Sequence, residues 1–83
     1  MVKMNLEVKT YATLREFSPP DTALGESFKI EISGNKIIDV INYLKIPLKQ
    51  QLIIMVNGIR ISDLNYELKK DDLIVFFPQL AGG

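Results

Sequence analysis

Hydrophobic and polar residues alternate strictly along two segments of the chain. The first covers residues 2–8, and its pattern allows an extension to Tyr11. The second covers residues 27–33, where Phe28, Ile30 and Ile32 are the apolar positions. A period of two is typical of a strand with one buried face. We therefore predict two half-buried strands, separated by a short helical turn at 13–17 and a loop that Pro19 and Pro20 enforce.

A third segment has the spacing of an amphipathic helix. Its apolar side chains share one face: Ile37, Ile38, Val40, Ile41 and Leu44. The preceding residues 33–35 (SGN) offer helix-capping chemistry. Pro47 lacks an N–H and cannot continue the ladder, so it ends the helix.

The second half of the chain predicts three more strands. Residues 52–56 form an unbroken apolar run, as expected of a strand covered on both faces. Asn57-Gly58 predicts a hairpin turn, with 59–61 as the returning strand. Residues 62–72 are polar and rich in turn formers, with Leu64, Tyr66 and Leu68 as inward anchors. Residues 73–77 form the last strand, which Pro78 terminates.

This order predicts an α+β domain with the layout of a ubiquitin-like β-grasp. We expect a mixed sheet of about five strands, with one main helix packed on one face. The last strand should lie in the sheet interior. Residues 1–77 are expected to form the domain, and 78–83 a flexible C-terminal tail that ends Gly-Gly.

Composition excludes several classes of function. Eighty-three residues make one domain. Ten basic and ten acidic residues balance, which argues against nucleic-acid and anionic-membrane binding. No apolar run approaches a membrane span, and the N-terminus lacks the apolar region of a secretory signal, so we expect a cytoplasmic protein. Near-zero net charge favours association with a partner protein.

Cysteine and histidine are both absent. The chain therefore cannot form a thiolate zinc site, a disulfide, a Cys-His pair or a Ser-His-Asp triad. It also lacks a phosphate-binding loop of the P-loop type. We expect no metal and no cofactor bound by this chain.

The two terminal glycines are the most informative feature of the sequence. A random chain would end in two glycines only about 0.5% of the time, which favours a chemical function for the pair. Glycine has no Cβ, so Gly82 and Gly83 can enter a narrow channel in another protein. The carboxylate of Gly83 is the predicted reactive group. A frayed tail and a remnant of cloning are the alternatives. From Pro78 the tail reaches at most about 20 Å.

Four segments together resemble the MoaD/ThiS family of ubiquitin-like sulfur carriers. They are the tail 76–83 (FFPQLAGG), residues 11–16 (YATLRE), the hairpin 56–58 (VNG) and the last strand 72–77 (DLIVFF). The tail is most similar to that of MoaD, the small subunit of molybdopterin synthase. The chain departs from the family pattern at 69–72 (KKDD), where a glycine is usual, and at Gln79, where a second proline is common. Typical ThiS chains are shorter and lack a segment like 17–27, which favours the molybdopterin alternative.

The resemblance implies a set of partners and a reaction. A MoeB-like adenylyltransferase, related to ubiquitin-activating enzymes, would adenylate Gly83 with ATP. A persulfide sulfurtransferase would supply sulfur for a C-terminal thiocarboxylate. A MoaE-like large subunit, in a heterotetramer, would receive that sulfur and build the dithiolene of molybdopterin. This chain would be the non-catalytic sulfur donor.

The resemblance and the residue types define the candidate site. Gly83 is the reacting residue, and the tail that enters a partner channel comprises Gly82, Ala81, Leu80 and Pro78. Phe77, Arg15 and Arg60 are candidates for the partner interface, although core packing for Phe77 and solvated surface charge for both arginines are alternatives. Asp71 and Asp72 are expected in a turn.

Three other functions stay open. The tail could serve thiamine thiazole synthesis, as in ThiS, or form an isopeptide bond to a lysine as a protein modifier. A β-grasp binding module would instead keep its activity without residues 81–83.

Overall fold

The computed structural model describes residues 3–23, 25–47 and 52–78. Its elements follow the predicted order, with small differences in their bounds. They are β1 (Met4–Thr10), η1 (Ala12–Phe17), β2 (Phe28–Ile32), α1 (Ile37–Leu44), β3 (Leu52–Val56), β4 (Ile59–Arg60) and β5 (Leu73–Pro78). The expected helical turn is the 3-10 helix η1.

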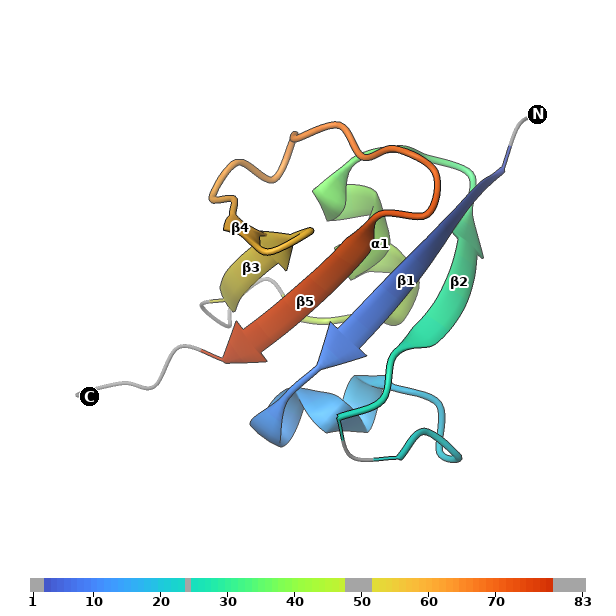
Figure 1. Cartoon of the computed structure of the whole chain (residues 1–83), viewed down its shortest axis with the longest axis vertical. Helices are drawn as coiled ribbons and strands as arrows, with labels where there is room; N and C mark the ends of the chain where they lie inside the picture. Colours follow the sequence, from blue (N-terminus) through green and yellow to red (C-terminus); the bar gives the residue numbers. More distant parts are fainter. Residues whose placement is uncertain (1–2, 24, 48–51, 79–83) are drawn as a thin grey trace.

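The five strands form one mixed sheet in the order β2-β1-β5-β3-β4 (Figure 1). The two central strands, β1 and β5, run parallel, and every other neighbouring pair is antiparallel. The last strand therefore lies in the sheet interior, as predicted. This is the ubiquitin-like β-grasp expected from the element order.

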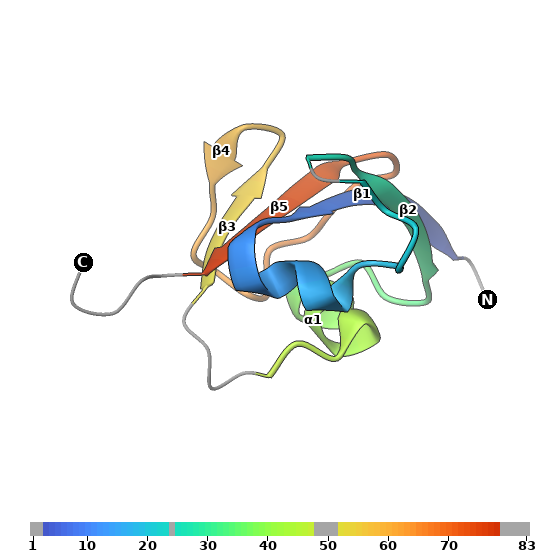
Figure 2. The same ribbon diagram turned by 90° about the horizontal axis from the view of Figure 1, so that it is seen from below.

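One face of the sheet is covered by both helices. Figure 2 shows α1 and η1 beneath this face. Alternate side chains of the strands point toward them and are buried: Leu6, Val8, Ile30, Ile32, Ile54, Val56, Ile74 and Phe76. The helices contribute Leu14, Ile37, Val40 and Ile41 to the same core. The apolar faces of the strands and of the helices thus pack together in a single layer.

The start of α1 is capped differently from the prediction. The N-cap is Lys36, whose backbone N–H donates to Asp39 Oδ2 at 3.0 Å, and no side chain of 33–35 caps the helix. Gly34 serves another purpose. A Cβ at this position would collide with the carboxylate of Asp39, so glycine leaves room for the acceptor that closes the first turn.

The hairpin at Asn57-Gly58 is confirmed. Both residues have positive φ, 52° and 86° respectively, as this tight turn requires. The Asn57 side chain donates to Asp72 Oδ1 at 2.9 Å and accepts the N–H of Leu73 at 3.0 Å. The turn is thereby joined to the beginning of β5.

Two further sequence predictions were wrong. Tyr66 is 39% exposed, whereas Leu68 is buried and Leu64 is partly buried, so only the two leucines anchor this irregular segment. The apolar run of β3 is not covered on both faces, because Ile53 and Met55 are only half-buried. Both residues point away from the helices.

Candidate functional site

The candidate site begins where β5 ends. Pro78 is the last residue of this strand and pairs with Leu52 of β3, so the strand runs one residue beyond its expected end at Phe77. A proline fits the terminal position because proline has no backbone N–H to donate, and no ladder hydrogen bond requires one at this position. Leu80, Ala81, Gly82 and Gly83 lie outside the described residues. The structure therefore places the base of the tail at the end of a central strand.

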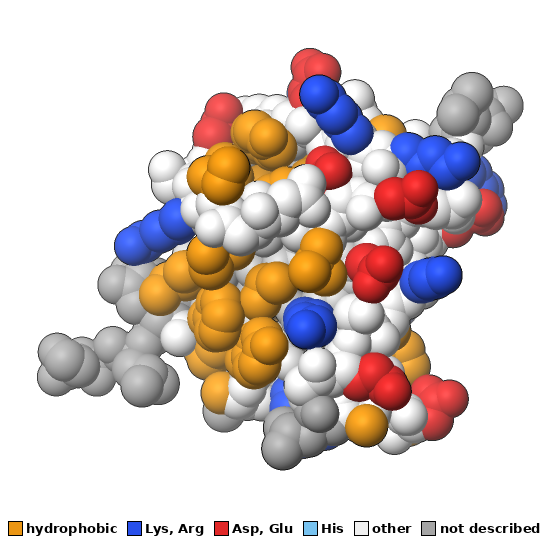
Figure 3. Space-filling view, in the orientation of Figure 1, with side chains coloured by type: hydrophobic (Ala, Val, Ile, Leu, Met, Phe, Trp, Pro, Cys, Tyr) orange, Lys and Arg blue, Asp and Glu red, His pale blue; other side chains and the backbone are white. Residues whose placement is uncertain are grey.

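The sheet face opposite the helices is apolar around β5. Side chains alternate along a strand, so Leu73, Val75 and Phe77 point away from the core. In the register with β3, Phe77 lies opposite Ile53, and Val75 lies opposite Met55. All five side chains are half-buried, and Figure 3 shows hydrophobic side chains gathered over β3 and β5. With Tyr11, they form what we name the open apolar face.

Tyr11 fixes the end of this face nearest the tail. Its ring stacks on Phe77 with the centroids 4.8 Å apart and the planes 7° apart. Its backbone N–H donates to the carbonyl of Phe76 at 3.1 Å. The segment after β1 therefore supports both the backbone and the side chain at the base of the tail.

Positive charge flanks the centre of the open apolar face. Val75 lies beside Lys9 of β1, and Met55 lies opposite Arg60 of β4. One row of the sheet thus reads lysine, valine, methionine, arginine. A complementary surface would be apolar in the middle, with acidic side chains on both sides.

The structure brings two of the three predicted interface residues onto one face. Phe77 and Arg60 both belong to the open side of the sheet. Arg15 is exposed on η1, beyond the end of β1, and does not lie in the sheet. Its role at a partner interface stays a prediction.

Sequence reasoning missed the other members of the face. From the sequence, Tyr11, Ile53, Met55, Leu73 and Val75 are interpreted only as members of strands or family-pattern segments, and Lys9 lies in the possible extension of the first strand. The available signal was the pair of continuous apolar runs, 52–56 and 73–77. If two such strands pair in a sheet with helices on one side only, their second faces must form an apolar patch.

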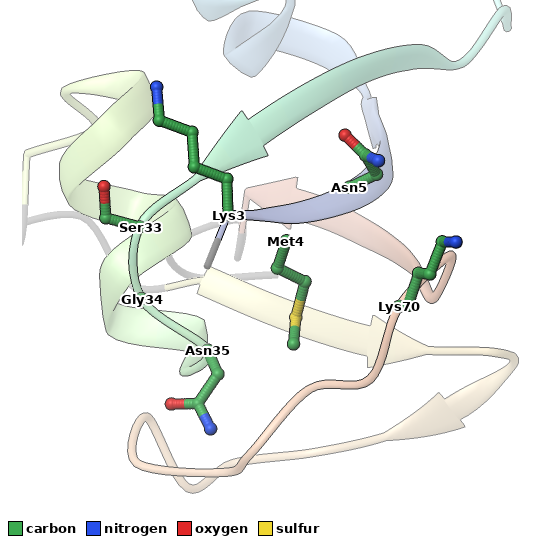
Figure 4. Close-up of a pocket in the computed structure, with 7 residues that line it drawn as sticks. All are labelled: Lys3, Met4, Asn5, Ser33, Gly34, Asn35 and Lys70. Atoms are coloured by element: carbon green, nitrogen blue, oxygen red, sulfur yellow. The ribbon is translucent and has the colours of Figure 1, made fainter. Parts of the chain in front are cut away.

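A cavity of about 490 Å³ lies at the other end of β1. Lys3, Met4 and Lys70 are among its lining residues, and Figure 4 shows the two lysines pointing away from each other on opposite sides of Met4. Their charges do not converge on one point. Because β1 and β5 are parallel, this cavity is also remote from the base of the tail.

Two further features bear on the site. Within 3–23, 25–47 and 52–78, no group of three or more acidic side chains is arranged to hold a metal ion. In the same part of the chain, no helix is both long enough and apolar enough to cross a membrane.

Comparison with known proteins identifies relatives over nearly the whole chain. A family model described as the ThiS family matches residues 8–83. No curated protein matched the sequence.

Several solved structures share the fold. Subunit 1 in a complex of subunits 1 and 2 of the molybdopterin-converting factor from Helicobacter pylori has a TM-score of 0.62 and 24% identity, over 96% of this chain and 100% of that one. The small archaeal modifier protein 1 of Methanosarcina acetivorans has a TM-score of 0.65 and 25% identity, with full coverage of both chains. The H. volcanii small archaeal modifier protein 1 has a TM-score of 0.69 and 16% identity, covering 93% and 99% respectively.

Proposed function

The chain belongs to the ThiS family, and from that premise we propose that it is the sulfur-carrying small subunit of a molybdopterin synthase. The observation that carries the proposal is the position of the open apolar face. This face ends at Phe77, and the segment that leads to Gly83 begins at Pro78. A partner that covers the face would receive the tail at the edge of the same contact.

The tail supplies an acceptor for sulfur and no catalyst. In the proposed reaction, a carboxylate oxygen of Gly83 attacks the α-phosphate of ATP and releases pyrophosphate. A persulfide sulfur then attacks the acyl adenylate and displaces AMP. A thiol cleaves the resulting acyl disulfide and leaves the thiocarboxylate. The thiols belong to partner enzymes, because this chain has no cysteine.

The proposed docking mode follows from the residues of the face. Phe77, Val75 and Met55 would be covered by an apolar partner surface, while Lys9 and Arg60 meet acidic side chains at its margins. Leu80 would enter the partner's channel, where complete burial of a leucine contributes about 1.5–3 kcal/mol. The Helicobacter pylori relative, which forms a complex with its subunit 2, supports a large subunit as one such partner.

The test is reconstitution of sulfur transfer. The chain is incubated with an adenylyltransferase of the MoeB type, ATP, a persulfide sulfurtransferase and a thiol, and its intact mass is measured. We expect one oxygen to be replaced by sulfur, and the product to convert a pterin precursor when the large subunit is added. Deletion of Gly83 should abolish both results. A chain extended by one alanine is the matched control, and undiminished sulfur delivery from it would refute the proposal.

Protein modification is a second candidate function. The full-length alignment with the Methanosarcina acetivorans modifier at 25% identity favours it, and the same Gly83 adenylate would serve as the acyl donor. In this case lysine nitrogen displaces AMP and forms an isopeptide bond. Proteolysis of cell extracts would then leave Gly-Gly remnants on target lysines, and these should disappear in a Gly83 deletion strain.

Sulfur supply for thiamine is a third candidate, since the matching family model is that of ThiS. Growth separates the two sulfur pathways. Loss of the gene should cause a thiamine requirement in one case and loss of molybdoenzyme activity in the other.

A further inference from the structure

The edge strand β2 has one side with which no other strand of residues 3–23, 25–47 and 52–78 pairs. It is the first strand in the sheet order, and in Figure 1 no helix or strand of the described residues lies outside it. The opposite edge strand, β4, is only two residues long. Short edges resist pairing with other chains, whereas β2 offers five residues.

Hydrogen bonds show which backbone groups of β2 face outward. The N–H of Glu7 donates to the carbonyl of Asp72 at 2.9 Å, so the backbone of Glu7 faces away from β2. Glu7 lies opposite Lys29 in the register. In an antiparallel pair, hydrogen-bonded and non-hydrogen-bonded positions alternate. The N–H and C=O groups of Lys29 and Glu31 therefore point away from β1, toward the free edge.

We propose that β2 pairs with β2 of a second copy of this chain, antiparallel and centred on Ile30. The two sheets would then form one continuous sheet with a two-fold axis. In this register Lys29 faces Glu31 of the second copy, and Glu31 faces its Lys29. Each of these two pairs exchanges two backbone hydrogen bonds, so all four outward groups are satisfied.

Charge selects this register over its neighbours. Both charged side chains are exposed on the open side of the sheet. Centring the pairing on Lys29 would place two lysines opposite each other, and centring it on Glu31 would oppose two glutamates. Like charges at directly opposed positions are destabilising. A shift of one residue would bring side chains of opposite faces together, so only the Ile30 register satisfies both conditions.

The apolar side of β2 fits the same arrangement. Phe28 would lie opposite Ile32 of the second copy, and the two Ile30 residues would meet at the axis. Phe28 also borders a groove of about 330 Å³ that is lined by Tyr43 and Leu44, and Tyr43 is 53% exposed. The balance of ten basic and ten acidic residues removes net repulsion between the copies.

The proposed β2 interface does not overlap the open apolar face, which is the surface assigned to sulfur transfer. The open apolar face surrounds β5 and β3, whereas β2 lies at the sheet margin. A dimer would therefore carry two available tails. Pairing through two strands of five residues predicts a small interface and weak association, since transient interfaces bury less than about 1,200 Å².

The experiment is a charge-exchange cycle measured by sedimentation velocity from micromolar to millimolar concentration. We expect a concentration-dependent dimer of the unmodified chain. K29E and E31K should each weaken the dimer roughly tenfold or more, because each change turns two attractive pairs into repulsive ones. The double variant K29E/E31K should restore it. A monomer at every concentration, or a double variant no better than the single ones, would overturn the proposal.

Three further variants separate alternative explanations. Lys29→Pro removes an outward N–H and no intramolecular hydrogen bond, so it should dissociate the dimer while circular dichroism stays unchanged. Lys3→Ala removes the intramolecular partner of Glu31, since Lys3 Nζ lies 4.0 Å from Glu31 Oε1. This variant should leave the dimer intact. Met55→Glu should also leave it intact; dissociation by this variant would place the contact on the open apolar face instead. Variants that are monomeric should load sulfur onto Gly83 as well as the unmodified chain does, so the dimer proposal and the sulfur-transfer proposal can fail independently.

Discussion

The ring of Tyr11 lies flat on the ring of Phe77, with 4.8 Å between the centroids. Tyr11 follows the end of β1, and Phe77 is the last side chain of the open apolar face before Pro78. The contact joins the two parallel central strands at the end from which the tail leaves. We expect it to restrict the direction in which the tail starts.

Replacing Tyr11 should therefore affect both stability and transfer. Tyr11→Ala removes an aromatic pair that contributes about 0.5–1.5 kcal/mol beyond simple burial. We expect a lower midpoint in urea unfolding and slower thiocarboxylation at saturating adenylyltransferase. Tyr11→Phe keeps the stack and is the control. Equal rates for the alanine and phenylalanine variants would show that the stack has no role in presenting the tail.

A charge at the centre of the open apolar face should prevent docking. Met55→Glu places a carboxylate between Ile53 and Val75, on a surface that the partner must desolvate. We expect affinity for the adenylyltransferase to fall at least roughly tenfold, with little change in the unfolding midpoint, as titration calorimetry and thermal melts would measure.

Glu7→Gln is the matched control, because Glu7 lies on the same side of the sheet, beside Leu73 at the margin of the face. If Met55→Glu binds as tightly as the unmodified chain, the partner contacts another surface.

Phe76 and Phe77 should respond in opposite ways to truncation. Phe76 is fully buried, and Phe76→Ala should cost about 3–5 kcal/mol, a large part of the stability of a small domain. Phe77→Ala should cost much less stability but weaken partner binding. Denaturant unfolding and binding measured on both variants provide the test. Loss of stability of similar size in the two would mean that Phe77 is a core residue after all.

Gly34→Ala should loosen the first turn of α1. The added methyl group would displace the Asp39 carboxylate and break its bond with the Lys36 N–H. We expect a cost of about 0.5–2 kcal/mol, similar to the loss of a helix cap, and faster hydrogen exchange at Lys36. Asp39→Ala should reproduce much of this effect, and the two changes together should be less than additive. Additive costs would indicate that Gly34 acts through another contact.

Much of the fold follows from local patterns. Alternation in residues 2–8 and 27–33, helical spacing in 37–44 and the Asn57-Gly58 turn each specify how a segment buries its apolar side chains. Each of these signals involves residues only a few positions apart in the chain, so it can be recognised without a structure. They led to the correct element order and to a central last strand. The prediction for 33–35 was wrong because Asp39 competes for the helix cap through a side chain that folds back onto Gly34.

The sequence by itself predicted Gly83 as the reacting residue and identified most of the residues that form the core. Gly83 stays a prediction from the chemistry of a glycine carboxylate, whereas the apolar strand pattern placed Phe76 in the core, where the structure has it. Only the tertiary structure decided how surfaces combine, because strand pairing joins residues that are distant in the chain. The register between β3 and β5 places Met55 beside Val75. Pairing with β1 and β4 then places Lys9 next to Val75 and Arg60 next to Met55. The sheet order likewise leaves Lys29 and Glu31 on a free edge. No local periodicity encodes these neighbours, since each strand's pattern specifies its buried face and not its partner.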